Sequence, residues 1–207
     1  HEGDRLQWTP LRLVHAEESL EISGGIAGEQ LQDIRVLASQ IDLSIVQRLM
    51  AFPDPMRGRA TLQVLLSGTL SAPLLHVDLN LQPEGRQNLP FQGVQTSLAY
   101  AEQLLQGQVR IQQADRDVLA VDLRFPVNMA LTAIPTDQRL VEGPIALDVH
   151  LRQPDLGAFA RWYQRLPQLT GTIQGTIGVH GTAAELNLKT DLELQKLGVR
   201  GTAEQVE

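Results

Sequence analysis

Apolar and polar residues alternate along several stretches of this 207-residue chain. In Leu75–Gln82 every odd position is apolar and every even position is polar, and Leu186–Leu194 keeps the same period apart from Thr190. Side chains of a β-strand point alternately to opposite faces, so this period predicts strands with one apolar and one solvated face. Because Asp117–Phe125 and Pro144–Leu151 repeat the pattern, we predict a mainly β protein.

Weaker alternation predicts further strands, which are separated by turns rich in Gly, Pro and Asp. These strands are Arg5–Val14, Ile34–Ser39, Thr61–Leu66, Thr96–Ala101, Gln108–Gln113, Val127–Ala133 and Gly171–Val179. Ala114–Asp117 is predicted to be a hairpin turn, in which Asp is favoured by local backbone hydrogen bonds. Ser23-Gly24-Gly25 is predicted to be a flexible loop. The strands should follow one another as a largely antiparallel meander.

Only two segments have a helical pattern of apolar residues. They are Asp42–Met50 and Asp155–Tyr163, each with an Asp at the N-cap and a proline, Pro53 or Pro167, beyond the end. Helices this short are marginal in isolation, so each is expected to dock its apolar side on the sheet.

These two helices belong to an internal repeat with an offset of 113 residues. Of the 50 positions in 36–85 aligned without gaps to 149–198, 14 are identical, where about three would match by chance. The identities include Asp42/Asp155, Gly58/Gly171 and Gly68/Gly181. We therefore expect one continuous segment over 1–207, with related units at about 30–86 and 143–199 joined by a β-meander at 87–142. Repeated β units favour an elongated structure over a closed globule.

The composition excludes several classes of site. With no cysteine, the chain has no disulfide, thiol nucleophile or Cys-ligated metal. Its net charge of −7 argues against nucleic acid as a partner. No catalytic or nucleotide-binding motif is present, the five histidines share no metal-ligand spacing, and Asp115-x-Asp117 fits a turn better than a cation site. We expect no enzyme activity, cofactor or metal.

The layout of the repeat resembles the C-terminal repeat region of TamB, in the AsmA-like group of bacterial envelope proteins. The first copy carries it as Asp42-Leu43, Gly58, Gly68–Pro73 and the alternating strand Leu74–Gln82. The second carries it as Asp155-Leu156, Gly171, Gly181–Glu185 and Leu186–Gln195. The second copy departs from the pattern because Leu186 stands where the first has Pro73, which predicts a looser turn.

This resemblance implies a β-taco, a long sheet folded into a U around an apolar groove. It also implies transport of phospholipid between the inner and outer membranes of a Gram-negative envelope, hence a periplasmic location. The alternative is a chaperone or scaffold for outer-membrane protein assembly, acting by β-strand addition with a barrel partner of the TamA type. No apolar run approaches the roughly 20 residues that span a bilayer. The resemblance implies that the chain is a segment of a larger protein, which is anchored in the inner membrane outside this segment.

The apolar faces of the strands are the candidate site for phospholipid or another acyl-chain ligand. The residues predicted to line the groove are Leu62, Val64, Leu66, Leu75, Val77, Leu79, Leu81, Leu119, Val121, Leu123, Ile145, Leu147, Val149, Leu151, Ile177, Val179, Leu188, Leu192 and Leu194. The lining is aliphatic, because aromatic residues make up only 4% of the chain. The alternative is a closed β-sandwich, in which the same residues pack against a second sheet.

Overall fold

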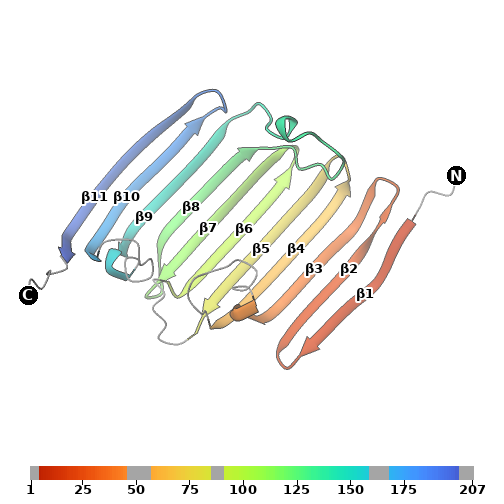
Figure 1. Ribbon diagram of the computed structural model, residues 1–207, viewed down its shortest axis with the longest axis horizontal. Coiled ribbons are helices and arrows are strands. Elements are labelled where there is room, and N and C mark those ends of the chain that lie inside the picture. The colour runs from red at the N-terminus through yellow and green to blue at the C-terminus, as the bar shows by residue number, and fades with distance from the viewer. Residues whose placement is uncertain (1–4, 46–56, 85–90, 159–167, 201–207) are drawn as a thin grey trace, which may run out of the picture.

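The computed structural model describes residues 5–45, 57–84, 91–158 and 168–200. Eleven strands follow one another along this part of the chain (Figure 1). They are β1 Arg5–His15, β2 Glu18–Ala27, β3 Gln30–Asp42, β4 Gly58–Thr69, β5 Pro73–Pro83, β6 Gly93–Ala101, β7 Leu104–Gln113, β8 Arg116–Pro126, β9 Ile145–Asp155, β10 Gln168–Gly181 and β11 Leu186–Arg200. A short 3-10 helix, η1 Thr136–Gln138, lies between β8 and β9.

All eleven strands form a single sheet in chain order, and every neighbouring pair is antiparallel. The sheet is not closed, because β1 and β11 are its two edges and lie at opposite ends of the molecule (Figure 1). The prediction of a mainly β, open and curved antiparallel sheet is therefore confirmed. The closed sandwich is wrong, because the described strands provide no second sheet.

Two local predictions are also wrong. Ser23-Gly24-Gly25 is not a loop but lies inside β2, at a register shift between Ser23 and Gly25 where the strand pairs with β3. Val127–Ala133 is not a strand; it makes one isolated bridge, Val127 to Leu140, and then follows an irregular path. The remaining predicted strands lie within observed ones, apart from Pro144, which precedes the first residue of β9. β2 was not predicted as a strand.

Both predicted helices begin where the sequence indicates. Asp42 accepts a hydrogen bond from the Ser44 backbone N–H at 2.7 Å, and Asp155 accepts one from the Gly157 N–H at 2.8 Å. Residues 43–45 and 156–158 form a helical turn after each cap. The rest of the two predicted helices, up to Met50 and Tyr163, lies outside the described residues.

The 113-residue offset also relates details of the backbone. Gln40 and Gln153 both have a positive φ, 56° and 58°. Gly58 and Gly171 have φ values of 133° and 118°. A Cβ on either would lie within 2.7 Å of the carbonyl oxygen of an equivalent glutamine in the next strand, Gln82 in β5 or Gln195 in β11. Equivalent turns join the last two strands of each unit, with Thr69 N–H bonded to Ala72 O and Thr182 N–H to Glu185 O.

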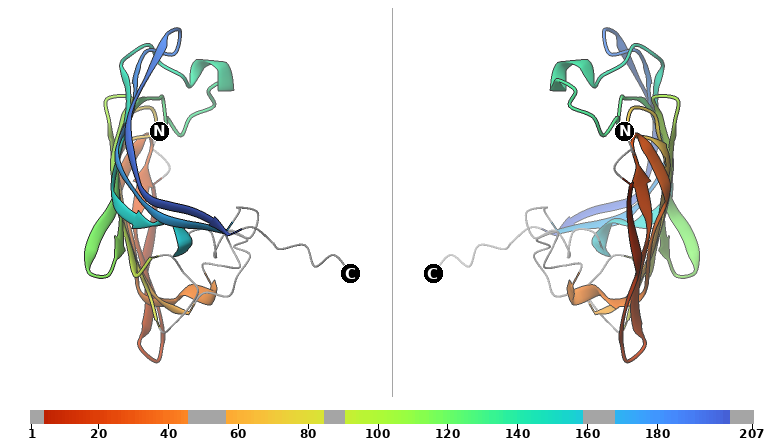
Figure 2. Two further views of the ribbon diagram at one scale, coloured as in Figure 1. Left: turned by 90° about the vertical axis from the view of Figure 1, so that its left-hand side faces the viewer. Right: turned by 90° about the vertical axis from the view of Figure 1, so that its right-hand side faces the viewer.

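Two structures lie on the same side of the sheet, at opposite ends of the strands (Figure 2). One is the excursion, residues 127–142, which contains η1. It is held by hydrogen bonds from the Met129 N–H to the Tyr100 hydroxyl and from the Leu131 N–H to the Leu70 carbonyl. The other is the pair of helical turns at 43–45 and 156–158. At their lower ends in Figure 2, β10 and β11 also curve toward this side, so the sheet forms an open trough with the excursion and the turns at its two rims.

The uncovered apolar face as candidate functional site

Strand register places the predicted groove residues on one face of the sheet. Directly paired residues of antiparallel strands share a face, and Leu62 pairs with Leu79 while Leu119 pairs with Leu151. The pairing continues through Gly175 of β10, which lies between Leu151 and Leu192. Every residue predicted to line the groove follows the same register. We call this surface the apolar face.

The apolar face also includes residues that were not predicted as lining. The pairs that extend it are Leu13 with Leu20, Ile22 with Val36, Leu81 with Val94, Tyr100 with Leu105, and Ile111 with Leu119. Most of them lie in strands that were predicted from weak alternation. Extending the same alternation of apolar and polar residues along those strands could have identified them. With these residues the apolar face runs across all eleven strands.

The apolar face is on the trough side of the sheet. Leu43, in the first helical turn, has no exposed surface and packs against Ala60, Ile41 and Leu81. Because Ala60 and Leu81 pair directly and lie on the apolar face, this turn covers one end of it. At the other end, the excursion bonds to Tyr100, whose ring is also on the apolar face and is buried. The trough floor is therefore apolar.

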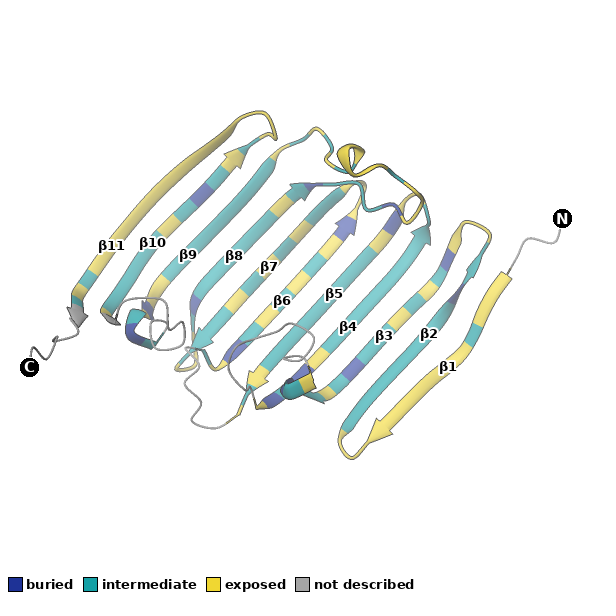
Figure 3. Ribbon diagram, in the orientation of Figure 1, coloured by how far each residue is buried: buried dark blue, intermediate teal, exposed yellow. Residues whose placement is uncertain are grey.

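Most of this floor has no covering layer. Only seven apolar residues of the described chain are buried, and most others on the central strands are half-buried (Figure 3). On β11 the leucines are open to solvent, with 67% of Leu188 and 43% of Leu192 exposed. The chain exposes 14216 Å², whereas a compact monomer of 22.8 kDa exposes about 9,600 Å².

The opposite face is polar and is crossed by side-chain hydrogen bonds between neighbouring strands. Gln108 donates to Asp122 at 2.9 Å, and Gln174 donates to Glu193 at 2.7 Å. His76, predicted on this face, bonds to Asp78 at 2.7 Å. Such bonds join side chains that already face water, so they fix the surface of the sheet without creating a buried polar site.

Two more histidines lie beside carboxylates on the polar face. His180 bonds to Asp148 at 2.8 Å, and His150 lies 3.9 Å from Asp122. Asp122 and Asp148 are directly paired between β8 and β9, so two like charges meet there and the histidines lie next to them. Within the described ranges, no three His, Asp or Glu side chains come close enough to hold a metal ion.

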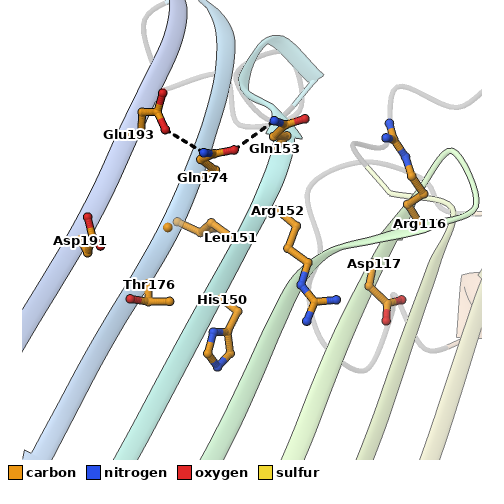
Figure 4. A pocket seen from close by; sticks show the side chains of 11 residues that line it. Arg116, Asp117, His150, Leu151, Arg152, Gln153, Gln174, Thr176, Asp191 and Glu193 are labelled. Atoms are coloured by element: carbon orange, nitrogen blue, oxygen red, sulfur yellow. Dashed lines mark hydrogen bonds between the residues drawn. The ribbon is translucent and has the colours of Figure 1, made fainter.

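A hollow of about 770 Å³ lies over the polar face rather than the apolar one (Figure 4). Its lining mixes both signs of charge, with Arg116 and Arg152 against Asp117, Asp191 and Glu193. The hollow is open to solvent, and the bonds drawn within it join Gln153, Gln174 and Glu193 in a chain. This arrangement stabilises the surface of three neighbouring strands.

The Asp115-x-Asp117 segment is part of the β7–β8 hairpin, as predicted. Ala114 and Asp115 form the turn, both with positive φ, 49° and 57°, which is the backbone of a two-residue hairpin loop. The Asp117 carboxylate accepts a hydrogen bond from Gln112 at 3.1 Å. Both aspartates therefore have a role in the turn or in strand pairing.

Among the described residues there is no helix with the length and apolarity needed to cross a membrane. Neither a protein-family model, nor a curated protein, nor a solved structure matches the chain.

Proposed function

We propose that the apolar face binds lipid acyl chains and that the chain is part of a conduit for phospholipid. The observation that supports this most directly is the continuity of an uncovered aliphatic surface across eleven strands. Exposed apolar patches of more than a few hundred Å² on soluble proteins mark interaction sites. A surface of this composition fits flexible aliphatic chains better than a rigid or polar ligand.

The physical basis is transfer of methylene groups out of water. Each CH₂ that leaves water contributes about 0.8 kcal/mol. The contacts are non-directional and nearly uniform from one strand to the next, so an acyl chain moves along the floor without breaking a specific bond. Polar head groups remain outside at the open side of the trough. Tight binding at one position would instead hold the cargo in place.

The direct test is to analyse the purified 207-residue chain for bound lipid, by native mass spectrometry and by organic extraction. We expect co-purified phospholipid or detergent on the unaltered chain. The variant Leu79→Asp places a charge in the centre of the floor and should abolish binding while the fold survives. Gln95→Asp is the matched control, because Gln95 is exposed on the polar face of the neighbouring strand and lies opposite Arg110.

If Leu79→Asp and Gln95→Asp retain equal amounts of lipid, the apolar face is not the binding surface. If the unaltered chain carries no lipid and takes up none from phosphatidylethanolamine vesicles or from detergent micelles, the proposal is wrong.

We further propose a place for this conduit, the periplasm, between the inner and outer membranes. This proposal depends on the resemblance of the repeat to AsmA-like envelope proteins, and the two units of the sheet, β3–β5 and β9–β11, are the part of the structure that carries that repeat. Localising the full-length protein in a Gram-negative host by membrane fractionation tests it. Recovery in the cytosolic fraction would contradict it.

The second candidate is a scaffold for outer-membrane protein assembly that acts by strand addition with a TamA-type barrel. The observation that favours it is that the sheet ends in strands paired on one side only, which are templates for a further strand. Edge substitutions distinguish the two functions. A proline at Thr190 in β11 should remove a strand-addition partner and leave lipid binding on the central strands unchanged.

A further inference from the structure

The two edges of the sheet differ in how open they are to pairing. In β1, Pro10 lies where the register with β2 shifts, between Trp8 and Leu11. Proline and bulges are the features that prevent further pairing at an edge. In β11, the register with β10 is unbroken from Leu186 to Gln195, and this stretch contains no proline. Of the two edges of the described sheet, β11 is therefore the one that is more open to further pairing.

The side chains of this stretch match a second copy of themselves. When two β11 strands pair antiparallel around a two-fold axis at Thr190, residue 190 + k of one copy lies opposite residue 190 − k of the other. On the polar face, Lys189 then lies opposite Asp191 twice. On the apolar face, Leu188 lies opposite Leu192 twice, and Leu186 opposite Leu194 twice.

Neighbouring registers lack this match. Successive side chains of a strand point to opposite faces of the sheet. A register that keeps the apolar faces of both copies on the same side must therefore have its two-fold axis at a residue and not between two residues. With the axis at Asp191 the two Asp191 side chains meet, and with the axis at Lys189 the two Lys189 side chains meet. With the axis at Leu192, Asp191 meets Glu193. Like charges directly opposite each other are destabilising, so of these four registers the axis at Thr190 is the one that avoids them.

The side chains needed for this pairing are available. Lys189 and Asp191 are exposed and make no ion pair with other described residues. Glu193 accepts hydrogen bonds from Gln174 and Gln195, and its carboxylate faces Asn187 of the other copy in this register. Leu188 and Leu194 are 67% and 53% exposed, so pairing removes apolar surface that β11 leaves in water.

We propose that two copies of this chain associate through β11, in antiparallel pairing around Thr190, to form one continuous sheet. A two-fold axis normal to the sheet keeps both apolar faces on the same side, so the two trough floors join. The proposal does not depend on lipid binding. A dimer can form whether or not the apolar face carries acyl chains.

The test uses the 207-residue chain in analytical ultracentrifugation over a range of protein concentrations. The unaltered chain should show a monomer–dimer equilibrium. Lys189→Asp places two like-charged pairs in the interface and should raise the dimer Kd at least tenfold, about 1.4 kcal/mol. Asp191→Lys should do the same, and an equimolar mixture of the two single variants should dimerise again, because each charge then meets its opposite.

A charge change at the other edge is the matched control. Arg12→Asp in β1 should leave the dimer Kd unchanged. In addition, Thr190→Cys should form a disulfide-linked dimer under mild oxidation, because directly opposed residues in antiparallel strands have Cα atoms about 4.5–5.5 Å apart. The chain has no other cysteine, so any linked dimer reports on this position.

Three results would overturn the proposal. The first is that the unaltered chain stays monomeric at every protein concentration measured. The second is a dimer that is insensitive to Lys189→Asp. The third is a dimer that Leu79→Asp abolishes and the charge variants leave intact, because it would mean that copies associate by burying their apolar faces against each other. Circular dichroism of each variant confirms that the sheet is formed, since both charged side chains are on the surface.

Discussion

Replacing Leu79 by Asp tests whether the trough floor is open to water. Leu79 lies in β5, near the middle of the sheet, and is half-buried between Leu62 and Thr96 of the neighbouring strands. Full burial of a leucine is worth about 1.5–3 kcal/mol, so losing a half-buried one costs about 1 kcal/mol. The lower strand propensity of Asp adds up to about 1 kcal/mol.

The expected cost of Leu79→Asp is therefore about 2 kcal/mol, within the 5–15 kcal/mol by which ordinary domains are stable. The new carboxylate stays in contact with water, so no further penalty arises. In a closed core the same carboxylate would be buried without a partner, and several more kcal/mol would be lost. An open floor thus predicts that the Leu79→Asp variant folds, whereas a closed core predicts that it unfolds.

Leu43 provides the reference for a position that is truly covered. Its side chain has no exposed surface, so Leu43→Asp should lose the whole transfer energy and also bury a charge, which is expected to detach the first helical turn. Urea unfolding followed by far-UV circular dichroism gives the free energy of unfolding for both variants. If Leu79→Asp is as damaging as Leu43→Asp, the floor is covered in solution, and the reasoning from an open apolar face fails.

Three further predictions concern the backbone and the rims of the trough. Gly58→Ala should lower the free energy of unfolding in urea by at least about 2 kcal/mol, because the added Cβ would lie 2.2 Å from a carbonyl oxygen. Gly28→Ala is the control: a Cβ there has nothing within 4 Å, so the variant should cost about 1 kcal/mol. Equal costs for the two variants would contradict a steric clash at Gly58. Tyr100→Phe removes the acceptor of the Met129 N–H. Hydrogen exchange at that amide should speed up by a factor of about five to ten, which corresponds to the loss of one hydrogen bond worth about 1 kcal/mol. Unchanged exchange would show that the excursion is held by other contacts. Asp155→Ala removes the cap of the second helical turn and should cost about 1 kcal/mol, and no change in the urea midpoint would mean that the turn contributes little.

Ten of the eleven strands were predictable, all but β2, because one face of each contacts apolar neighbours and the other contacts water. Leu75–Gln82 illustrates this, since its four apolar residues all lie on the apolar face and its polar ones on the other. Whether that face is covered was not predictable from the period. The same alternation serves a closed sandwich and an open sheet, and only the pairing of all eleven strands in one layer decides between them.

The two local errors have identifiable physical causes. Gly24 and Gly25 are typical of a loop, but here they accommodate close backbone approach. A Cβ on Gly24 would lie 2.6 Å from the Cα of Ile34, and one on Gly25 would lie 2.8 Å from the Leu6 carbonyl oxygen. Glycine in a strand marks such a contact as often as a break, and a single sequence does not distinguish the two.

Val127–Ala133 alternates as a strand does, but its backbone bonds to other partners. The Met129 N–H bonds to the Tyr100 hydroxyl, and the Arg139 side chain donates to the carbonyl of Asn128. These partners are distant in sequence or on the far side of η1, so the pattern contains no sign of them. Tertiary hydrogen bonds therefore override the local preference, and the segment forms one rim of the trough in place of a twelfth strand.

The stability of a sheet without a second layer and its open apolar face have the same origin. Each floor residue is half covered by its cross-strand neighbours, as Val121 is by Val109 and Val149, and these pairs together with the backbone ladder stabilise the sheet. The half that stays in water is the surface that we propose binds acyl chains. Adding a covering layer would raise stability and remove that surface, whereas reducing cross-strand contact would expose more apolar surface and weaken the sheet. An aliphatic floor with one covered helical turn at its rim therefore keeps the sheet folded and leaves the apolar face open to solvent.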